Sequence, residues 1–99
     1  MVNKTEILTF LSDNKNKLFS EYQLVKIGLF GSFSKSEETK DSDIDLIVEF
    51  EPNTENLSEK KYKIRSLIKN KFNREVDLCR EKYIKPYFKS QILKSVIYV

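Results

Sequence analysis

The segment Asp43–Phe50 (DIDLIVEF) is the clearest strand in this sequence and requires the fold to contain a sheet. Its side chains alternate with a period of two, which is the period of a β-strand. The alternation predicts that an apolar row packs into the core while two aspartates share the other face. The first row is Ile44, Leu46, Val48 and Phe50, and the second is Asp43, Asp45, Ile47 and Glu49.

Two further strands are predicted, one before and one after this segment. Leu24–Phe30 (LVKIGLF) is short, apolar and partly β-branched, as buried strands are. Glu75–Arg80 (EVDLCR) again alternates between two faces. The three strands together predict a small sheet. In the last of them, one face holds Val76 and Leu78 and the other holds Asp77 and Cys79.

Three helices are predicted around this sheet. Residues 4–22 and Leu57–Phe72 each carry apolar residues near one helical face. Pro86 suits the first turn of a final helix, whose core face would consist of Phe88, Ile92 and Val96. The order helix, strand, strand, helix, strand, helix predicts an α/β (α+β) fold, formed as one small domain over residues 1–99.

The absence of histidine and the single cysteine exclude several chemistries. Without histidine there is no Ser-His-Asp or Cys-His catalytic system and no Cys/His zinc site. Cys79 has no intrachain partner for a disulfide and is predicted to be a small core residue. Carboxylates are then the available hard ligands, and they favour Mg²⁺ or Mn²⁺.

The net charge of +3 permits an anionic partner without demanding one. Basic residues concentrate between Lys60 and Arg74, on a predicted solvated helix face that lacks the interleaved aromatic residues of an RNA site, beyond Tyr62 and Phe72. No apolar run approaches the roughly 20 residues of a membrane helix, and the N-terminus lacks a signal peptide's apolar stretch. These observations predict a cytoplasmic protein that does not bind nucleic acid directly.

The candidate site combines three aspartates with a Gly-Ser turn. Asp43 and Asp45 are two residues apart on a strand, so both point to one face, roughly 6–7 Å from each other. They repel each other unless a cation lies between them. If the strand of Asp77 neighbours this one, three carboxylates converge on one patch, which suits two metal ions. Gly31-Ser32, where a strand turns into a helix, offers backbone N–H groups and a hydroxyl to phosphate oxygens.

This ordered set resembles the nucleotidyltransferase superfamily related to DNA polymerase beta. The residues that carry the resemblance are Gly31-Ser32, a ten-residue spacer, Asp43-Ile44-Asp45-Leu46-Ile47-Val48, and later Val76-Asp77-Leu78. More closely, the chain is similar to the minimal nucleotidyltransferase (MNT) proteins, which are antitoxin partners of HEPN-domain ribonuclease toxins. Its ending, with Pro86, Ile92-Leu93 and Val96, is similar to the family's closing helix.

The resemblance implies the polymerase beta-like nucleotidyltransferase fold, a small mixed sheet flanked by helices. It implies that Asp43, Asp45 and Asp77 bind two Mg²⁺ ions, and that Asp77 also helps to deprotonate an acceptor hydroxyl. Gly31 and Ser32 would hold the triphosphate of ATP. Some members transfer AMP from ATP to a tyrosine of the toxin and so silence it. For this chain, the resemblance implies the same reaction within a hetero-oligomer with a HEPN toxin.

One motif departs from the family pattern. Members often have Ala-Arg-Gly shortly after Gly-Ser, whereas this chain has Ser34-Lys35-Ser36. Lys35 keeps a positive charge near the phosphates, without the planar fork of arginine. The missing glycine is expected to alter the turn at Ser36.

Two other functions compete with AMP transfer. The first is a non-catalytic antitoxin that neutralises its toxin by binding alone, with a decayed site, as the departure at residues 34–36 suggests. The second is modification of a small molecule such as an antibiotic, which usually needs a further domain that 99 residues leave little room for. Asp→Asn changes at Asp43, Asp45 and Asp77 distinguish AMP transfer from the non-catalytic antitoxin. They abolish neutralisation by AMP transfer and spare neutralisation by binding alone.

Overall fold

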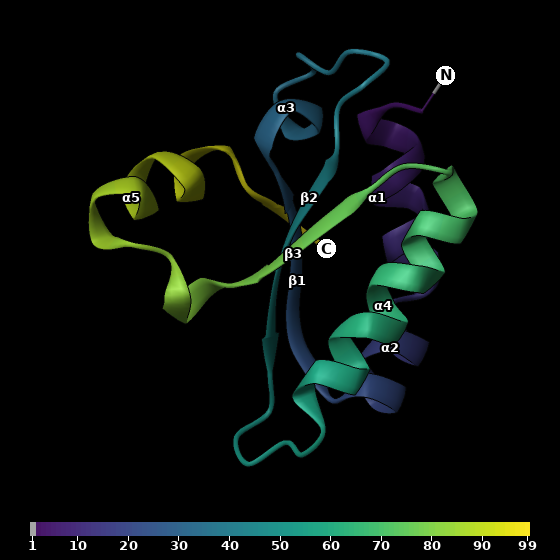
Figure 1. The fold of residues 1–99 in the computed structure, drawn as a ribbon, viewed down its shortest axis with the longest axis vertical. Helices are drawn as coiled ribbons and strands as arrows, with labels where there is room; N and C mark the ends of the chain where they lie inside the picture. Colours follow the sequence, from purple (N-terminus) through teal and green to yellow (C-terminus); the bar gives the residue numbers. More distant parts are fainter. Residues whose placement is uncertain (1) are drawn as a thin grey trace.

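A computed structural model describes residues 2–99 and contains the predicted small mixed sheet (Figure 1). Its strands lie in the order β3-β2-β1-β4. β1 is antiparallel to β2 and β4, whereas β2 and β3 are parallel. The α/β prediction is confirmed, although β4 escapes prediction because two residues are too few for a periodic pattern. The bounds are β1 Leu24–Phe30, β2 Ile44–Phe50, β3 Val76–Arg80 and β4 Ile97–Tyr98.

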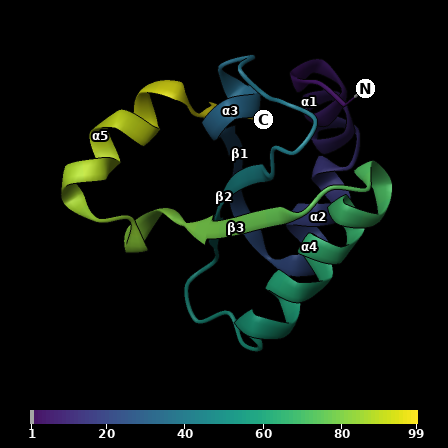
Figure 2. The same ribbon diagram turned by 45° about the horizontal axis from the view of Figure 1, so that its top comes forward.

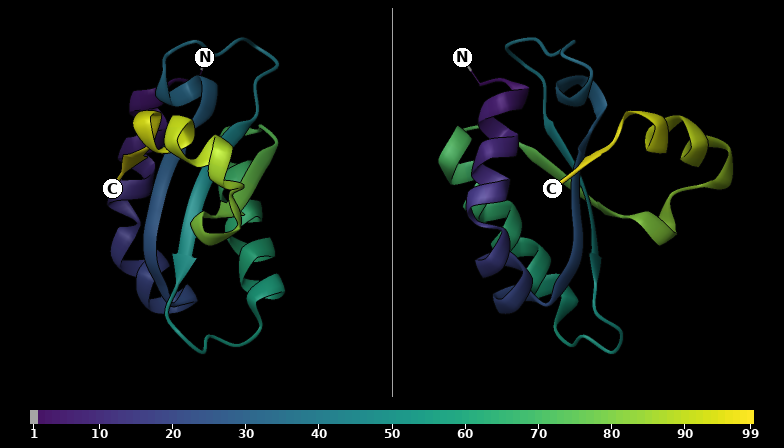
Figure 3. Two further views of the ribbon diagram at one scale, coloured as in Figure 1. Left: turned by 90° about the vertical axis from the view of Figure 1, so that its left-hand side faces the viewer. Right: turned by 180° about the vertical axis from the view of Figure 1, so that it is seen from behind.

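Three helices cover one face of the sheet, namely α1 (Lys4–Asp13), α2 (Lys15–Tyr22) and α4 (Leu57–Phe72) (Figure 3). The apolar row of β2 faces them, as the alternation predicts, and the aspartate row consequently points away from this core. Within residues 2–99, no helix combines the length and the apolar character needed to cross a lipid bilayer. Fully buried core residues include Ile7, Leu11, Leu18, Ile27, Leu29, Leu46, Val48, Ile64 and Ile68.

The prediction of one helix over residues 4–22 is wrong, because the segment forms two helices that meet at Asn14. The side-chain amide of Asn14 donates a hydrogen bond of 2.8 Å to the carbonyl oxygen of Phe10. Its backbone N–H donates to the same oxygen at 3.1 Å. Asparagine competes for backbone partners in this way and so interrupts helices. Hydrophobic spacing does not reveal the break, since the apolar residues on both sides of it face the same core.

After β3, a 3₁₀-helix η1 (Glu81–Tyr83) leads to the last helix, α5 (Pro86–Ser95), on the opposite side of the sheet from α4 (Figures 1 and 2). No residue of α5 is buried, and Phe88 is 48% exposed. The prediction that Phe88, Ile92 and Val96 pack into the core is therefore wrong, since Ile92 and Val96 are only partly buried. This sheet face carries the buried Ile47 but also four charged side chains, so it offers a helix less apolar surface than the other face does. The four are Lys26, Asp45, Glu49 and Asp77.

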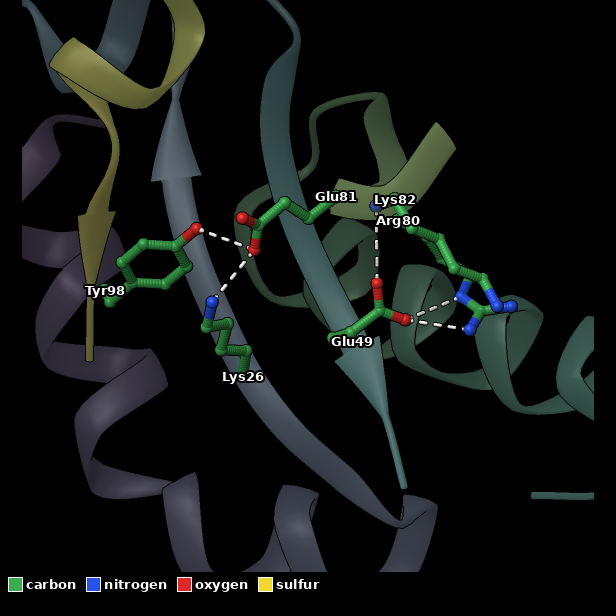
Figure 4. Close-up of polar contacts among 6 residues, drawn as sticks. All are labelled: Lys26, Glu49, Arg80, Glu81, Lys82 and Tyr98. Carbon is green, nitrogen blue, oxygen red and sulfur yellow. Dashed lines mark hydrogen bonds and ion pairs between the residues drawn. The ribbon is translucent and has the colours of Figure 1, made fainter. Parts of the chain in front are cut away.

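Carboxylates fasten both ends of the segment that bears α5 (Figure 4). Glu81 accepts hydrogen bonds from Lys26 Nζ at 3.0 Å and from Tyr98 Oη at 3.3 Å. The bond from the Lys26 ammonium lowers the pKa of Glu81. On β2, Glu49 accepts a hydrogen bond of 2.9 Å from Arg80 Nε. The segment therefore starts and ends at fixed points on the sheet.

Candidate active site

The Gly31-Ser32 turn lies directly beside Asp45. β1 ends at Phe30, which pairs with Asp45 across the sheet, and α3 (Gly31–Ser34) begins at the next residue. Gly31 has a φ of +75°, in the left-handed region that favours glycine. A Cβ added at this position would collide with the Asp45 carboxylate. The turn therefore approaches the carboxylate this closely because residue 31 has no side chain.

The strand register brings Asp77 next to Asp45. The two residues are direct partners in the parallel pairing of β2 with β3, and paired strands lie about 4.8 Å apart. Asp43 immediately precedes β2, and its charge acts on Asp45. The expected neighbourhood of the three aspartates is therefore present in the fold, while their functional roles remain predictions.

The charged groups that act on the Asp45 carboxylate are both negative. Burial, the charge of Asp77 and the charge of Asp43 together raise the pKa of Asp45 to about 6. All three causes disfavour the ionised carboxylate, so its ionisation at neutral pH is assisted by a nearby positive charge. A divalent cation meets this need, and Mg²⁺ prefers oxygen ligands of this kind.

The three carboxylates do not form a closed cage. Within residues 2–99, no three or more Asp, Glu, Cys or His side chains are arranged so that together they could hold a metal ion. Mg²⁺ usually keeps several waters and takes one or two carboxylates together with substrate phosphates. An open set of three carboxylates therefore fits an ion that arrives with a nucleotide.

The raised pKa of Asp45 predicts how the stability of the metal-free protein depends on pH. The folded-state pKa of about 6 lies above the ordinary value of 3.8. Folding therefore favours the protonated form, and this stabilisation is complete below the ordinary pKa and lost as the pH rises through about 6. Asp45→Asn should raise the midpoint of thermal unfolding at neutral pH, and the gain should shrink in acid. A gain that is the same at every pH would contradict this account.

A small pocket of about 190 Å³ joins the Gly31 turn to α5. Lys35, which was predicted to lie near the phosphates, is exposed at its edge. Gln91 and Ser95 also line the pocket but were not predicted as site residues, because no local pattern shows which helix approaches a turn far earlier in the chain. The full lining is Phe30, Gly31, Lys35, Gln91, Ile92 and Ser95.

Larger hollows lie away from the aspartates. One of about 480 Å³ lies at the far end of β2, where Glu49, Arg80 and Lys82 contribute to its lining. Another, of about 620 Å³, lies beside α4 and is lined in part by Tyr62 and Arg65. Neither contains the paired aspartates Asp45 and Asp77, so chemistry and not size identifies the candidate site.

Cys79 lies on the aspartate face of β3, two residues after Asp77. It is only partly buried, so the prediction that it is a core residue is wrong. Alternation explains the error, because the neighbouring Leu78 takes the buried face instead. Burial and the charges of Asp77 and Asp45 raise the pKa of the thiol, which makes a thiolate nucleophile at this position unfavourable.

The turn after α3 accommodates a serine where the related motif has glycine. Ser36 has a φ of 58°, in the left-handed region that glycine enters without strain. The backbone N–H of Ser36 donates to the carbonyl of Phe33 at 3.2 Å, and that of Glu37 donates to Ser32 at 2.9 Å. The turn is therefore closed by hydrogen bonds, and the serine adds backbone strain without opening it.

Ser36→Gly should stabilise the protein by about 0.5–1 kcal/mol. A left-handed conformation costs a non-glycine residue about 1–2 kcal/mol, and the freedom of glycine in the unfolded chain offsets part of this gain. Urea unfolding of the variant and the parent measures the difference. Ser20→Gly, within α2, is the matched control and should destabilise by several tenths of a kcal/mol or more, up to about 1. Destabilisation by both changes would contradict strain at Ser36.

The sequence pattern of the nucleotidyltransferase domain family matches residues 7–99. A candidate protein adenylyltransferase of Methanocaldococcus jannaschii is 34% identical over 100 residues, which covers all of both chains. The protein adenylyltransferase MntA of Thermococcus cleftensis is 29% identical over 99 residues, covering 100% of this chain and 98% of the relative. The matched regions therefore span the positions of the glycine turn and of the three aspartates.

Two solved structures share the fold. A structure described as that of a candidate minimal nucleotidyltransferase has a TM-score of 0.76 at 24% identity, covering 97% of this chain and 95% of its own. A complex of a tri-AMPylated HEPN toxin of Shewanella oneidensis with an MNT antitoxin contains a chain with a TM-score of 0.59 at 20% identity. That match covers 91% of this chain and 69% of the other. At these identities the likeness confirms the fold.

Proposed function

Because the chain belongs to the nucleotidyltransferase domain family, we propose that it is an antitoxin that transfers AMP from ATP to a hydroxyl of a HEPN-domain toxin and thereby silences it. One observation carries the proposal: β2 and β3 pair Asp45 with Asp77 beside a glycine turn that comes close to the Asp45 carboxylate. A nucleotidyltransferase needs metal-binding carboxylates and a phosphate cradle at one place, and this end of the sheet offers residues suited to both.

In the proposed reaction, the acceptor oxygen attacks the α-phosphorus of ATP. The bond from that phosphorus to the oxygen leading to the β-phosphate breaks, so that AMP joins the acceptor and pyrophosphate leaves. Asp77, which is exposed, takes the proton of the acceptor hydroxyl. Two Mg²⁺ ions held by Asp43, Asp45 and Asp77 would supply neutralisation of the phosphate charge. Gly31, Ser32 and Lys35 orient the triphosphate for in-line attack.

The names of the relatives support the choice of acceptor. The relative from Thermococcus cleftensis is a protein adenylyltransferase, which favours a protein over a small molecule. The Shewanella oneidensis complex holds an AMPylated HEPN toxin with its MNT antitoxin, which favours a toxin of that class. We propose a tyrosine as the acceptor residue and a cytoplasmic hetero-oligomer as the working form.

The test incubates the purified protein with Mg²⁺ and ATP labelled at the α-phosphate in a lysate of its own host. A labelled protein band that carries AMP on tyrosine by mass spectrometry, and that disappears with Asp43→Asn, supports the proposal. ATP labelled at the γ-phosphate is the matched control and should leave the band unlabelled, because pyrophosphate departs. Neutralisation of a co-purifying toxin without any label would instead favour occlusion.

A further inference from the structure

The segment 82–94 concentrates positive charge. It contains four lysines and no aspartate or glutamate. The net charge of the whole chain is +3, so the remainder of the chain is slightly negative. The nearest carboxylate in sequence, Glu81, is already bonded to Lys26 and Tyr98. The lysines are Lys82, Lys85, Lys89 and Lys94.

The same segment presents three exposed aromatic side chains. Tyr83 is 71% exposed, Tyr87 69% and Phe88 48%. The rings of Tyr87 and Phe88 contact each other, with 4.3 Å between their centroids. Since no residue of η1 or of α5 is buried, these rings are not covered by the chain's own core. Clustered exposed aromatic residues of this kind are typical of a surface that a partner covers.

The segment lies on the aspartate side of the sheet, away from the helices that cover the core (Figures 1 and 3). Through Gln91 and Ile92 it lines the pocket beside Gly31 and Lys35. Glu81, directly before the segment, is bonded to Lys26 on β1 and to Tyr98 on β4. A macromolecule bound to this segment would therefore lie next to the candidate active site.

We propose that segment 82–94 docks the acceptor protein by recognising a surface rich in glutamate and aspartate that also offers apolar contacts. The proposal rests on the proposed function for the identity of that partner as the acceptor. The lysines attract and orient an acidic surface, and the exposed rings supply the apolar contact that anchors it.

The composition of the segment favours an acidic protein over a nucleic acid. Its cations are all lysines, and the last arginine of the chain, Arg80, is bonded to Glu49. The fork of arginine binds carboxylate and phosphate groups alike, but its planar guanidinium also stacks on bases. A segment without arginine can attract carboxylates through its lysines but lacks this means of stacking on the bases of a nucleic acid.

The test measures the binding of a fluorescein-labelled copolymer of glutamate and tyrosine by fluorescence anisotropy. ATP is left out, so that binding is separate from AMP transfer. The variant K82Q/K85Q/K89Q should bind the copolymer about tenfold more weakly at low salt. The matched variant K17Q/K63Q/K71Q removes the same number of charges from α2 and α4, on the other side of the sheet, and should bind as the parent does.

A second variant, Y87S/F88S, tests the contribution of the exposed aromatic side chains to binding. It should lose the binding that the parent retains at high salt, where charge attraction is screened. Equal weakening by both lysine variants, tighter binding of single-stranded RNA than of the copolymer, or no binding at all would each overturn the proposal. If the copolymer binds as expected but no AMP is transferred in lysate, the recognition of an acidic surface stands and the proposed function is overturned instead.

Discussion

Asp45→Asn is expected to abolish AMP transfer, lowering kcat by about a thousandfold or more, while the protein stays folded. The amide preserves the shape of the side chain but removes the charge that would hold a metal ion beside the phosphates. A thousandfold loss corresponds to about 4 kcal/mol of transition-state stabilisation, a range typical of losing one charge-stabilising group. The rate of label transfer from ATP to the acceptor measures it.

Nucleotide binding by the same variant gives a second readout, in which the expected change has opposite directions with and without Mg²⁺. With Mg²⁺, Asp45→Asn should bind a non-hydrolysable ATP analogue more weakly than the parent. Without Mg²⁺ it should bind the analogue more tightly, because one negative charge beside the triphosphate is gone. Asp41→Asn, at an exposed position before β2, is the matched control and should change neither result. Unchanged transfer by Asp45→Asn would contradict the location of the site.

The central part of the fold is predictable because its apolar patterns are long. The strand predicted over Asp43–Phe50 is observed as Ile44–Phe50, and the helix predicted over Leu57–Phe72 has those bounds. In each, a row of apolar residues shows its period over several repeats. The pairing of Asp45 with Asp77 is different. Alternation shows which face each aspartate takes, whereas the pairing of their strands is a long-range contact.

Other features depend on contacts that no local pattern reveals. The helix break at Asn14 depends on a side-chain hydrogen bond. β4 lies against β1 at Gly28, where an added Cβ would be 2.8 Å from side-chain atoms of Val96 and Tyr98. The last helix has the spacing of a core helix, yet the sheet face beside it carries several charged side chains. Amphipathic spacing predicts that a helix face is suited to being covered, and it does not show whether the same chain covers it.

Gly31→Ala should reduce AMP transfer by about a hundredfold or more, and it should do so through Asp45. The new methyl group would collide with the Asp45 carboxylate and would lie 3.1 Å from its Cγ and 3.2 Å from its Cβ, so the whole side chain must move. A misplacement of about 1 Å in an active site can cost about a hundredfold in rate. The φ of +75° adds strain for alanine, of about 1–2 kcal/mol. Rates and urea unfolding measure the two effects.

Ser36→Gly separates these two effects, because it is expected to stabilise the turn at the other end of α3 without touching Asp45. The variant that combines Gly31→Ala with Ser36→Gly should regain part of the lost stability and none of the lost activity. It should also bind the ATP analogue with Mg²⁺ as weakly as Gly31→Ala alone. If restored stability brought activity back, strain and not displacement of Asp45 would explain the loss. If it does not, the missing side chain at position 31 is what allows the turn after β1 and the carboxylate of β2 to serve one site.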